Sequence, residues 1–354
     1  MSEFGVYVHI PFCRHRCDYC AFATWTDRDH LMVAYVDAVI ADIARAVEEG
    51  MPVADTVFFG GGTPTRLAPE LLASIVAAIP VADNAEITVE CNPDDVTVEM
   101  MKTYVATGVN RISMGVQSMV DHVLQSLNRT HDPANVVGAI AAARSAGISS
   151  INLDLIYGVH GESVDDWRTT VEQTIASQPT HISAYGLTVE AGTPLADDPS
   201  RHPDDDDQAD KYILADDLFT AAGLMNYEIS NWALAGHECR HNQVYWSQGN
   251  YTGFGCAAHS HRDGRRWWNV RTPDRYIDCV AKNETVEASH EVLDGPTRAR
   301  EALELSLRTS QGVPKDALDS VFLGDLVTEI GNRVVLTRKG RLLGNEVSLH
   351  LKPN

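Results

Sequence analysis

Three cysteines near the start of the chain have the spacing of a metal site. Cys13, Cys17 and Cys20 form the pattern C-x3-C-x2-C, and the other cysteines of the 354-residue chain are scattered, at Cys91, Cys239, Cys256 and Cys279. An odd total with a single cluster argues against a disulfide framework and favours metal binding. Three thiolates suit a four-iron cluster, because each holds one iron and the fourth iron stays open to a small molecule. A tetrahedral zinc site completed by His9 or His15 is the alternative.

The chain around these cysteines alternates between strand-like and helix-like patterns. Short segments rich in β-branched and aromatic residues predict six strands, at 6–10, 55–60, 86–91, 110–118, 151–158 and 181–189. Stretches with helical character lie between them, among them 30–49, 68–79 and 133–147. Strands that alternate with helices indicate βαβ units and a parallel sheet. The expected fold is therefore α/β, with six units that suit a curved sheet or an incomplete barrel as well as an open doubly wound sheet.

Polar and glycine residues follow several of these strands at the same end. The segment GGGTP at 60–64 follows the second strand, Glu90 ends the third, Gln117 ends the fourth and Asp154 lies within the fifth. In barrel-like α/β proteins, the carboxyl ends of the strands and the loops after them build the active site. We therefore expect these four features to surround one open end of the sheet, which we call the mouth.

Composition and charge narrow the class of protein. With 44% hydrophobic and 22% charged residues the chain is typical of a globular protein, and its length favours one large and one smaller unit. No stretch approaches the roughly 18 apolar residues of a membrane helix, and no secretory signal is visible. We therefore expect a cytoplasmic protein with no integral membrane segment.

The net charge of −21 argues against nucleic acid as a partner. The acidic run Asp204–Asp207 is interpreted as a solvated loop that leads into a helix.

The sequence pattern changes in the last third of the chain. Residues 231–290 are dense in aromatic residues, histidine and glycine, and they predict a connecting segment after a first domain at 1–230. Residues 297–322 have helical character, and 332–347 predict a strand, a turn and a last helix. We interpret 291–354 as a small winged-helix-like domain. With this charge, such a domain is expected to be a lid or docking unit rather than a DNA reader.

The cysteine spacing, taken with GGGTP after the second strand, resembles the radical S-adenosylmethionine (SAM) superfamily. The resemblance implies an incomplete (β/α)6 barrel with a [4Fe-4S] cluster on Cys13, Cys17 and Cys20. It also implies that SAM chelates the open iron, while glycines let the backbone approach the methionine part of SAM. Matched residue by residue, the SAM contacts that it implies are Tyr7, Tyr19, Gly61, Gly62, Thr63, Glu90, Gln117, Arg129 and Asp154.

A closer resemblance covers nearly the whole chain. The segments YVHIPFC, GGGTPT, ECNPDD, RISMGVQS, LNRTH and NLDLIYG have the order found in oxygen-independent coproporphyrinogen III oxidase and the HemW family of haem chaperones. The oxidase has a fourth cysteine where this chain has Phe22, and it carries an N-terminal extension before the first strand. The segment HNQVYW at 241–246 is similar to the H-N-x-x-Y-W motif of the chaperones. One departure is Ala21, because the chaperones commonly have an acidic residue there.

The chaperone resemblance implies a protein that binds haem and delivers it to an acceptor protein, with a reductant such as flavodoxin or ferredoxin. The alternatives are radical decarboxylation of coproporphyrinogen III and another radical SAM reaction on a tetrapyrrole. No catalytic residue is assigned. His241 is the candidate haem ligand, and His237, His259 and His261 stay open. The competing interpretation is that HNQVYW forms a packed turn in which the histidine is structural. Aromatic rings suited to a porphyrin are nearby in the sequence, at Tyr245, Trp246, Trp267 and Trp268.

Overall fold

The structure is a computed structural model that describes residues 3–320 and 323–352. Six neighbouring parallel strands form the centre of its large sheet: β1 Phe4–Ile10, β2 Ala54–Gly61, β3 Val81–Cys91, β4 Arg111–Gln117, β5 Ser150–Tyr157 and β6 His181–Gly186. All six predicted strands are present in the predicted order. The expected α/β fold with a mostly parallel, barrel-like sheet is therefore confirmed.

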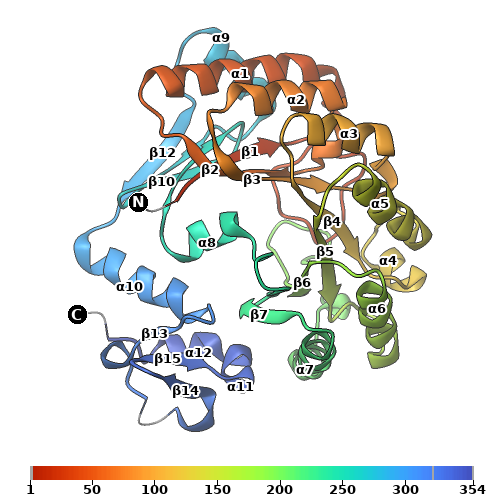
Figure 1. Ribbon diagram of the computed structural model, residues 1–354, viewed down its shortest axis with the longest axis vertical. Helices are drawn as coiled ribbons and strands as arrows, with labels where there is room; N and C mark the ends of the chain where they lie inside the picture. Colours follow the sequence, from red (N-terminus) through yellow and green to blue (C-terminus); the bar gives the residue numbers. More distant parts are fainter. Residues whose placement is uncertain (1–2, 321–322, 353–354) are drawn as a thin grey trace.

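Helices cover the outer face of this curved sheet (Figure 1). They are α1 Met32–Glu48, α2 Pro69–Ala78, α3 Val98–Ala106, α4 Asp121–Ser126, α5 Pro133–Ser145, α6 Val164–Ala176 and α7 Asp205–Ala221. Strand side chains alternate between the two faces, and the outward ones, such as Val6 and Val8 on β1, are fully buried in the main core. The inward ones are polar, such as Tyr7 and His9. This alternation directs the polar side chains toward the inside of the curve. Within the described ranges no helix has the length and apolar character that crossing a membrane requires.

The region after residue 225 extends the large sheet at both of its ends. Strands β7 Met225–Glu228 and β8 Asn231–Ala233 join it beside β6, and β9 Asn250–Phe254 pairs parallel to β1. Three antiparallel strands follow β9, namely β10 His259–Arg262, β11 Arg265–Asn269 and β12 Glu287–Val292. We call β9–β12 the wing. Helix α8 Arg240–Trp246 lies inside the curve, and α9 Pro273–Ala281 packs on α1 (Figure 1). The predicted domain boundaries stay a prediction.

The last part of the chain forms a small unit with its own sheet and core. Helix α10 Gly295–Leu307 leads to a sheet of β13 Val313–Pro314, β15 Arg333–Leu336 and β14 Val327–Ile330, followed by α11 Arg338–Leu342 and α12 Gly344–Ser348. The helix predicted over 297–322 is wrong beyond Leu307 for the residues described, and 321–322 lie outside them. Gly312 has φ +60° and a Cβ there would collide with the Val334 carbonyl, while Pro314 pairs in β13. Neither residue fits a helix interior, so a helix cannot continue through this stretch to 322.

The acidic run begins a helix, as predicted. Asp204 caps α7 by accepting a hydrogen bond from the Asp207 amide at 2.9 Å. Asp207 also pairs at 2.7 Å with Lys211, whose ammonium group is buried and lies 3.0 Å from the Glu162 carboxylate. The loop after β5 is held by the same Glu162, which accepts a hydrogen bond from the Gly158 amide at 2.9 Å.

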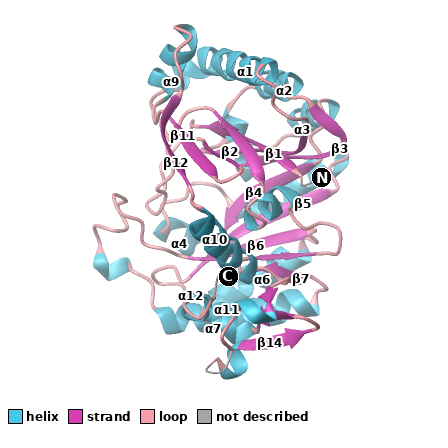
Figure 2. Cartoon of the chain, turned by 90° about the vertical axis from the view of Figure 1, so that its left-hand side faces the viewer, coloured by secondary structure: helices cyan, strands magenta, loops and turns pink. Residues whose placement is uncertain are grey.

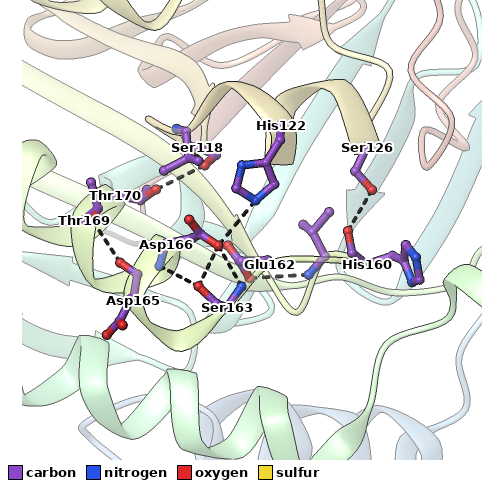
Figure 3. Close-up of polar contacts among 12 residues, drawn as sticks. Ser118, His122, Ser126, His160, Glu162, Ser163, Asp165, Asp166, Thr169 and Thr170 are labelled. Carbon is purple, nitrogen blue, oxygen red and sulfur yellow. Dashed lines mark hydrogen bonds and ion pairs between the residues drawn. The ribbon is translucent and has the colours of Figure 1, made fainter.

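The start of α6 fixes this loop further (Figure 3). Ser163 and Asp166 form a reciprocal capping box, and His122 of α4 lies 3.3 Å from the Asp166 carboxylate. The Ser126 hydroxyl donates to the His160 carbonyl at 2.9 Å. These contacts tie α4 to the loop that follows β5, and β5 is the strand that carries one of the predicted site acids.

Candidate cluster and cofactor site

The three clustered cysteines lie on a loop that is closed by its own backbone. The Trp25 amide donates to the Pro11 carbonyl at 2.8 Å, and the Cys13 amide donates to the Trp25 carbonyl at 3.0 Å. Within the loop, the Cys20 amide donates to the Cys17 carbonyl at 3.2 Å, which forms a turn between these two cysteines. All three cysteines are half-buried. The loop therefore presents its thiols without burying them in the core.

Side chains from two later segments hold the far end of this loop. Asp18 accepts hydrogen bonds from the Asn128 amide group at 2.8 Å and from the Arg201 guanidinium at 2.9 Å. Arg201 also donates to the Ser126 carbonyl at 2.5 Å. These anchors come from sequence positions more than a hundred residues away, and none was singled out in the sequence.

The charges around the thiols suit a cationic centre. Burial raises the pKa of the Cys13 and Cys20 thiols, and the neighbouring Cys17 charge raises both further. A metal centre would supply the positive charge that favours thiolates. In residues 3–320 and 323–352, no three or more His, Cys, Asp or Glu residues are grouped as ligands of a single ion. A four-iron cluster does not need its ligands grouped around one ion, because each thiolate binds a separate iron. The donor set fits such a cluster.

The glycine-rich segment lies directly against the cysteine loop. The Gly62 amide donates to the Ile10 carbonyl at 2.8 Å, and the Thr63 amide donates to the Phe12 carbonyl at 2.8 Å. A Cβ on Gly62 would lie 2.7 Å from the Phe12 carbonyl oxygen and 3.1 Å from the Cys13 sulfur. Gly61 has φ +108°, which side chains rarely allow. Gly62 is therefore required by the close approach of two backbone segments, and Gly61 by its own backbone conformation.

Two acids face the same space from the inner surface of the sheet. Glu90 accepts a hydrogen bond from the Gly61 amide at 3.2 Å, and Asp154 accepts one from the Ser113 hydroxyl at 2.7 Å and one from the Asn152 amide group at 2.8 Å. Desolvation is the main cause that raises the pKa of Glu90 to about 8, and the charge of Asp154 adds to it. Desolvation also raises the pKa of Asp154, against the hydrogen bond from Ser113. The predicted mouth thus brings the glycine segment and both acids together.

The other predicted contact residues line the same mouth on the side of Cys17. Arg129 donates to the Gly115 carbonyl at 2.8 Å and to the Cys17 sulfur at 3.6 Å, while its Nε is buried without a partner. The Gln117 amide group lies beside Gly115, where a Cβ would meet it at 2.9 Å. Tyr19 packs against a small apolar cluster nearby. A cation with an unused donor next to a thiol is suited to a carboxylate ligand.

A histidine that sequence reasoning did not assign to the SAM site lies among these residues. His9 Nδ1 is 3.1 Å from the Tyr7 hydroxyl, and Nε2 is 2.8 Å from the Ala23 carbonyl oxygen. A carbonyl only accepts, so Nε2 carries the proton and Nδ1 accepts from Tyr7. Desolvation lowers the pKa of His9 to about 4, which keeps the ring neutral. Its position two residues after Tyr7 on a strand is the signal that could have identified it, because both side chains face inward.

The structure places His241 inside α8, with both ring nitrogens engaged. Nδ1 is 2.8 Å from the Thr56 hydroxyl and Nε2 is 2.8 Å from the Tyr245 hydroxyl. Only 1% of the residue is exposed, and desolvation lowers its pKa to about 3. Glu86 of β3 caps the start of the helix by accepting from the His241 amide at 3.1 Å. Coordination of haem by His241 stays a prediction, and it would require the ring to give up one of these hydrogen bonds.

Comparisons with known proteins agree with this geometry. The family model of the radical SAM superfamily matches residues 7–174. Over 98% of its length the chain is 38% identical to the heme chaperone HemW of Mycobacterium tuberculosis, with 94% of that relative covered. The chain belongs to the HemW family of the radical SAM superfamily. HemW of Bacillus subtilis is 35% identical, with 97% of each chain covered, and HemW of Escherichia coli is 34% identical, with 98% and 97% covered.

The fold of the chain is also found in a protein with a much less similar sequence. The solved structure of coproporphyrinogen III oxidase (HemN) from Escherichia coli, described as a radical SAM enzyme, has a TM-score of 0.84 to this chain. The match covers 98% of this chain and 89% of the oxidase chain. Because the sequence identity is only 21%, the match shows that the two proteins share a fold and no more. Membership of the HemW family therefore rests on the sequence relatives. Phe22, which distinguishes the chain from the oxidase pattern, is 65% exposed at the end of the cysteine loop.

Proposed function

We propose that this protein is a haem chaperone that binds a [4Fe-4S] cluster, SAM and haem, and that delivers haem to an acceptor protein. The observation that carries the proposal is the similarity to heme chaperones over nearly the whole chain. The close packing of the glycine segment on the cysteine loop supports the cluster and SAM parts. A reductant such as flavodoxin or ferredoxin and a cytoplasmic location belong to the same proposal.

The cluster is proposed to bind to Cys13, Cys17 and Cys20, and a reduced [4Fe-4S] cluster supplies single electrons to SAM. SAM is proposed to lie in the mouth described above. Glu90 and Asp154 offer oxygens to its ammonium group or its ribose hydroxyls, and arginine pairs well with a carboxylate. The remaining proposed contacts are Arg129, Gln117, Tyr7, Tyr19 and the backbone of Gly61, Gly62 and Thr63.

Affinity for SAM is expected to rise with pH because of Glu90. With its pKa raised to about 8, most of this carboxyl is protonated at neutral pH, and binding an ammonium group requires the charged form. The α-amino group of SAM loses its own proton with a pKa of about 8, which offsets part of this gain, so the dissociation constant should fall roughly two- to threefold between about pH 7 and about pH 8. Calorimetric titration of SAM into the reconstituted protein, in buffers with different ionisation enthalpies, measures the dissociation constant and the protons exchanged on binding.

Glu90→Gln is the informative variant for this prediction, because glutamine keeps the shape and loses the titration. Its SAM affinity should be lower than that of the wild type at about pH 8, and it should fall rather than rise with pH over the same range because only the amino group of SAM then titrates. Glu70→Gln, an acid in the first turn of α2, is the control and should keep the wild-type profile. A Glu90→Gln protein with an unchanged pH profile would contradict the role given to this acid.

Haem binding and oxidase activity separate the proposed function from its alternative. Anaerobically purified protein with a reconstituted cluster should bind haemin with a saturable Soret band. The same protein, given SAM, a reductant and coproporphyrinogen III, should yield no protoporphyrinogen. The oxidase activity is tested because the chain shares its fold with the oxidase. Product formation would favour the oxidase, and absence of saturable haem binding would remove the basis of the chaperone proposal.

A further inference from the structure

The inner face of the wing carries a row of aromatic and histidine side chains. In the strand register His259 lies opposite Trp268, and His261 lies opposite both Arg266 and Tyr251. Residues two apart on a strand share a face, so all five side chains lie on one face of the wing. The Tyr251 ring is 4.6 Å from the ring of Tyr245 in α8, which shows that this face looks toward the inside of the curve.

His259 differs from the other histidines that the sequence left open as haem ligands. His241 is bonded at both ring nitrogens, and so is His261, through the Gly249 carbonyl at 2.8 Å and the Gly264 amide at 3.1 Å. His237 lies after β8, with no aromatic ring packed on it in the part of the chain that the structure describes. His259 is exposed, and among the described residues no hydrogen bond reaches its ring.

The surroundings of His259 suit a porphyrin on an iron. Its ring is stacked on the half-buried Trp268 indole, with centroids 5.8 Å apart and planes 26° from parallel. A metal ligand must be the neutral imidazole. Desolvation, followed by the charge of Arg266, lowers the pKa of His259 and favours that form. Gly253 of β9 lies opposite Tyr7 of β1, and a Cβ on Gly253 would collide with the His259 carbonyl oxygen. The His259 backbone therefore lies beside the part of β1 that carries Tyr7.

A cavity begins at Arg266, which is two residues from Trp268 on β11. It has a volume of about 370 Å³ and lies between β11, α10 and the C-terminal unit. Its walls are mixed: Leu305 and Leu336 are apolar, while Glu301 and Glu304 of α10 are acidic. Figure 2 shows α10 between the wing strands above it and α12 below it. Two arginines, Arg266 and Arg308, line the cavity, and the Nε of each is buried without an acceptor.

The two arginines differ in how far their charge is already used. Arg266 pairs with Glu291 at 2.9 Å and with Glu301 at 3.0 Å. Arg308 forms no ion pair within 4 Å among the described residues, although its charge acts against the desolvation that raises the pKa of the buried Glu228. Its guanidinium lies 5.6 Å from the ring centre of Trp246, the last residue of the H-N-x-x-Y-W segment. A guanidinium with an unused Nε donor at the wall of a cavity that also has apolar side chains is suited to a carboxylate on an otherwise apolar ligand.

We propose that haem binds on the inner face of the wing, with His259 as the axial ligand of the iron, Trp268 stacked on the imidazole so that its edge meets the porphyrin, and a propionate directed to Arg308 in the cavity. This inference rests on the proposed haem-binding function and names the residues that carry it. On a strand, Trp268 and Arg266 are about 7 Å apart, so the indole and the cavity are neighbouring parts of one surface.

Haemin titration of His259→Ala, with the absorption and electron paramagnetic resonance spectra of the iron, tests the axial ligand. The dissociation constant should rise at least about tenfold, the spin-state signature of the wild type should be lost, and added imidazole should restore it. His290→Ala is the control, because its partner in the register is Trp267, whose side chain is on the opposite face of the wing from Trp268. The tryptophans form a second matched pair: Trp268→Ala should weaken binding and Trp267→Ala should not.

Haem dimethyl ester tests the propionate contact. Arg308→Ala should weaken haemin binding about tenfold but leave binding of the ester unchanged. Arg300→Ala in α10, the helix that Arg308 follows, should affect neither. If the wild type binds no haemin, the proposed function fails. If the wild type binds haemin and His259→Ala keeps its affinity and spectrum, this inference alone is overturned. Loss of the iron signature in His241→Ala, with His259→Ala unchanged, would likewise overturn it.

Discussion

Replacing Cys13, Cys17 and Cys20 together with alanine is expected to give a folded protein that holds no iron–sulfur cluster. The fold should survive because the loop is closed by backbone hydrogen bonds and by the contacts of Asp18, none of which uses a cysteine side chain. The cluster should be lost because thiolates are the ligands that hold iron in such a centre. After anaerobic reconstitution, iron and sulfide per chain should fall from about four to background, and SAM binding should fall with them.

A buried cysteine provides the control for this triple variant. Cys279 lies on α9 in the main core, away from the cysteine loop, and Cys279→Ala should keep the full iron content with only a modest loss of stability. Circular dichroism and thermal unfolding of both variants separate loss of the cluster from loss of the fold. Full iron content in the triple variant would show that other ligands hold the metal, and the SAM site proposed at the open iron would lose its basis.

Sequence reasoning found the mouth of the site because strand periodicity and chain order determine it. Glu90 and Asp154 are 64 residues apart in the sequence, yet both end up on inner faces at the same end of parallel strands. The parallel order of the six strands was enough to predict their approach. The contact of Gly61 with Glu90 follows from the same logic, because β2 and β3 are neighbours.

The surroundings of α8 could not be predicted in the same way. The partners of His241 are Thr56 and Glu86, which lie on separate strands and have no pattern of their own in the sequence. A lone threonine and a lone glutamate on amphipathic strands are common, so only the tertiary packing reveals their role. The same is true of Arg308, because its place at the cavity wall depends on the docked C-terminal unit rather than on the helix it follows.

Gly62→Ala is expected to weaken SAM binding through the backbone, with no polar group removed. A methyl group at this position would lie 2.7 Å from the Phe12 carbonyl oxygen and 2.8 Å from the Ile10 carbonyl oxygen, so the glycine segment must move away from the cysteine loop. Overpacking between two backbone segments costs about 2 kcal/mol, and the affinity of the reconstituted protein for SAM should fall about thirtyfold. Equilibrium dialysis with SAM measures the affinity, and denaturant unfolding measures the accompanying loss of stability.

The chain offers a matched glycine for comparison. Gly138 lies in α5, where a Cβ would meet nothing within 4 Å, so Gly138→Ala adds the same methyl group without a collision. This control should keep wild-type SAM affinity and gain up to about 1 kcal/mol in stability, since alanine is the better helix former. The added Cβ would lie closest to the Phe12 and Ile10 carbonyl oxygens and 3.1 Å from the Cys13 sulfur. The variant keeps all three thiols, so Gly62→Ala should keep most of its iron. Unchanged SAM affinity in Gly62→Ala would mean that SAM does not depend on the packing of these two loops, and the proposed site would have to lie elsewhere on the inner face.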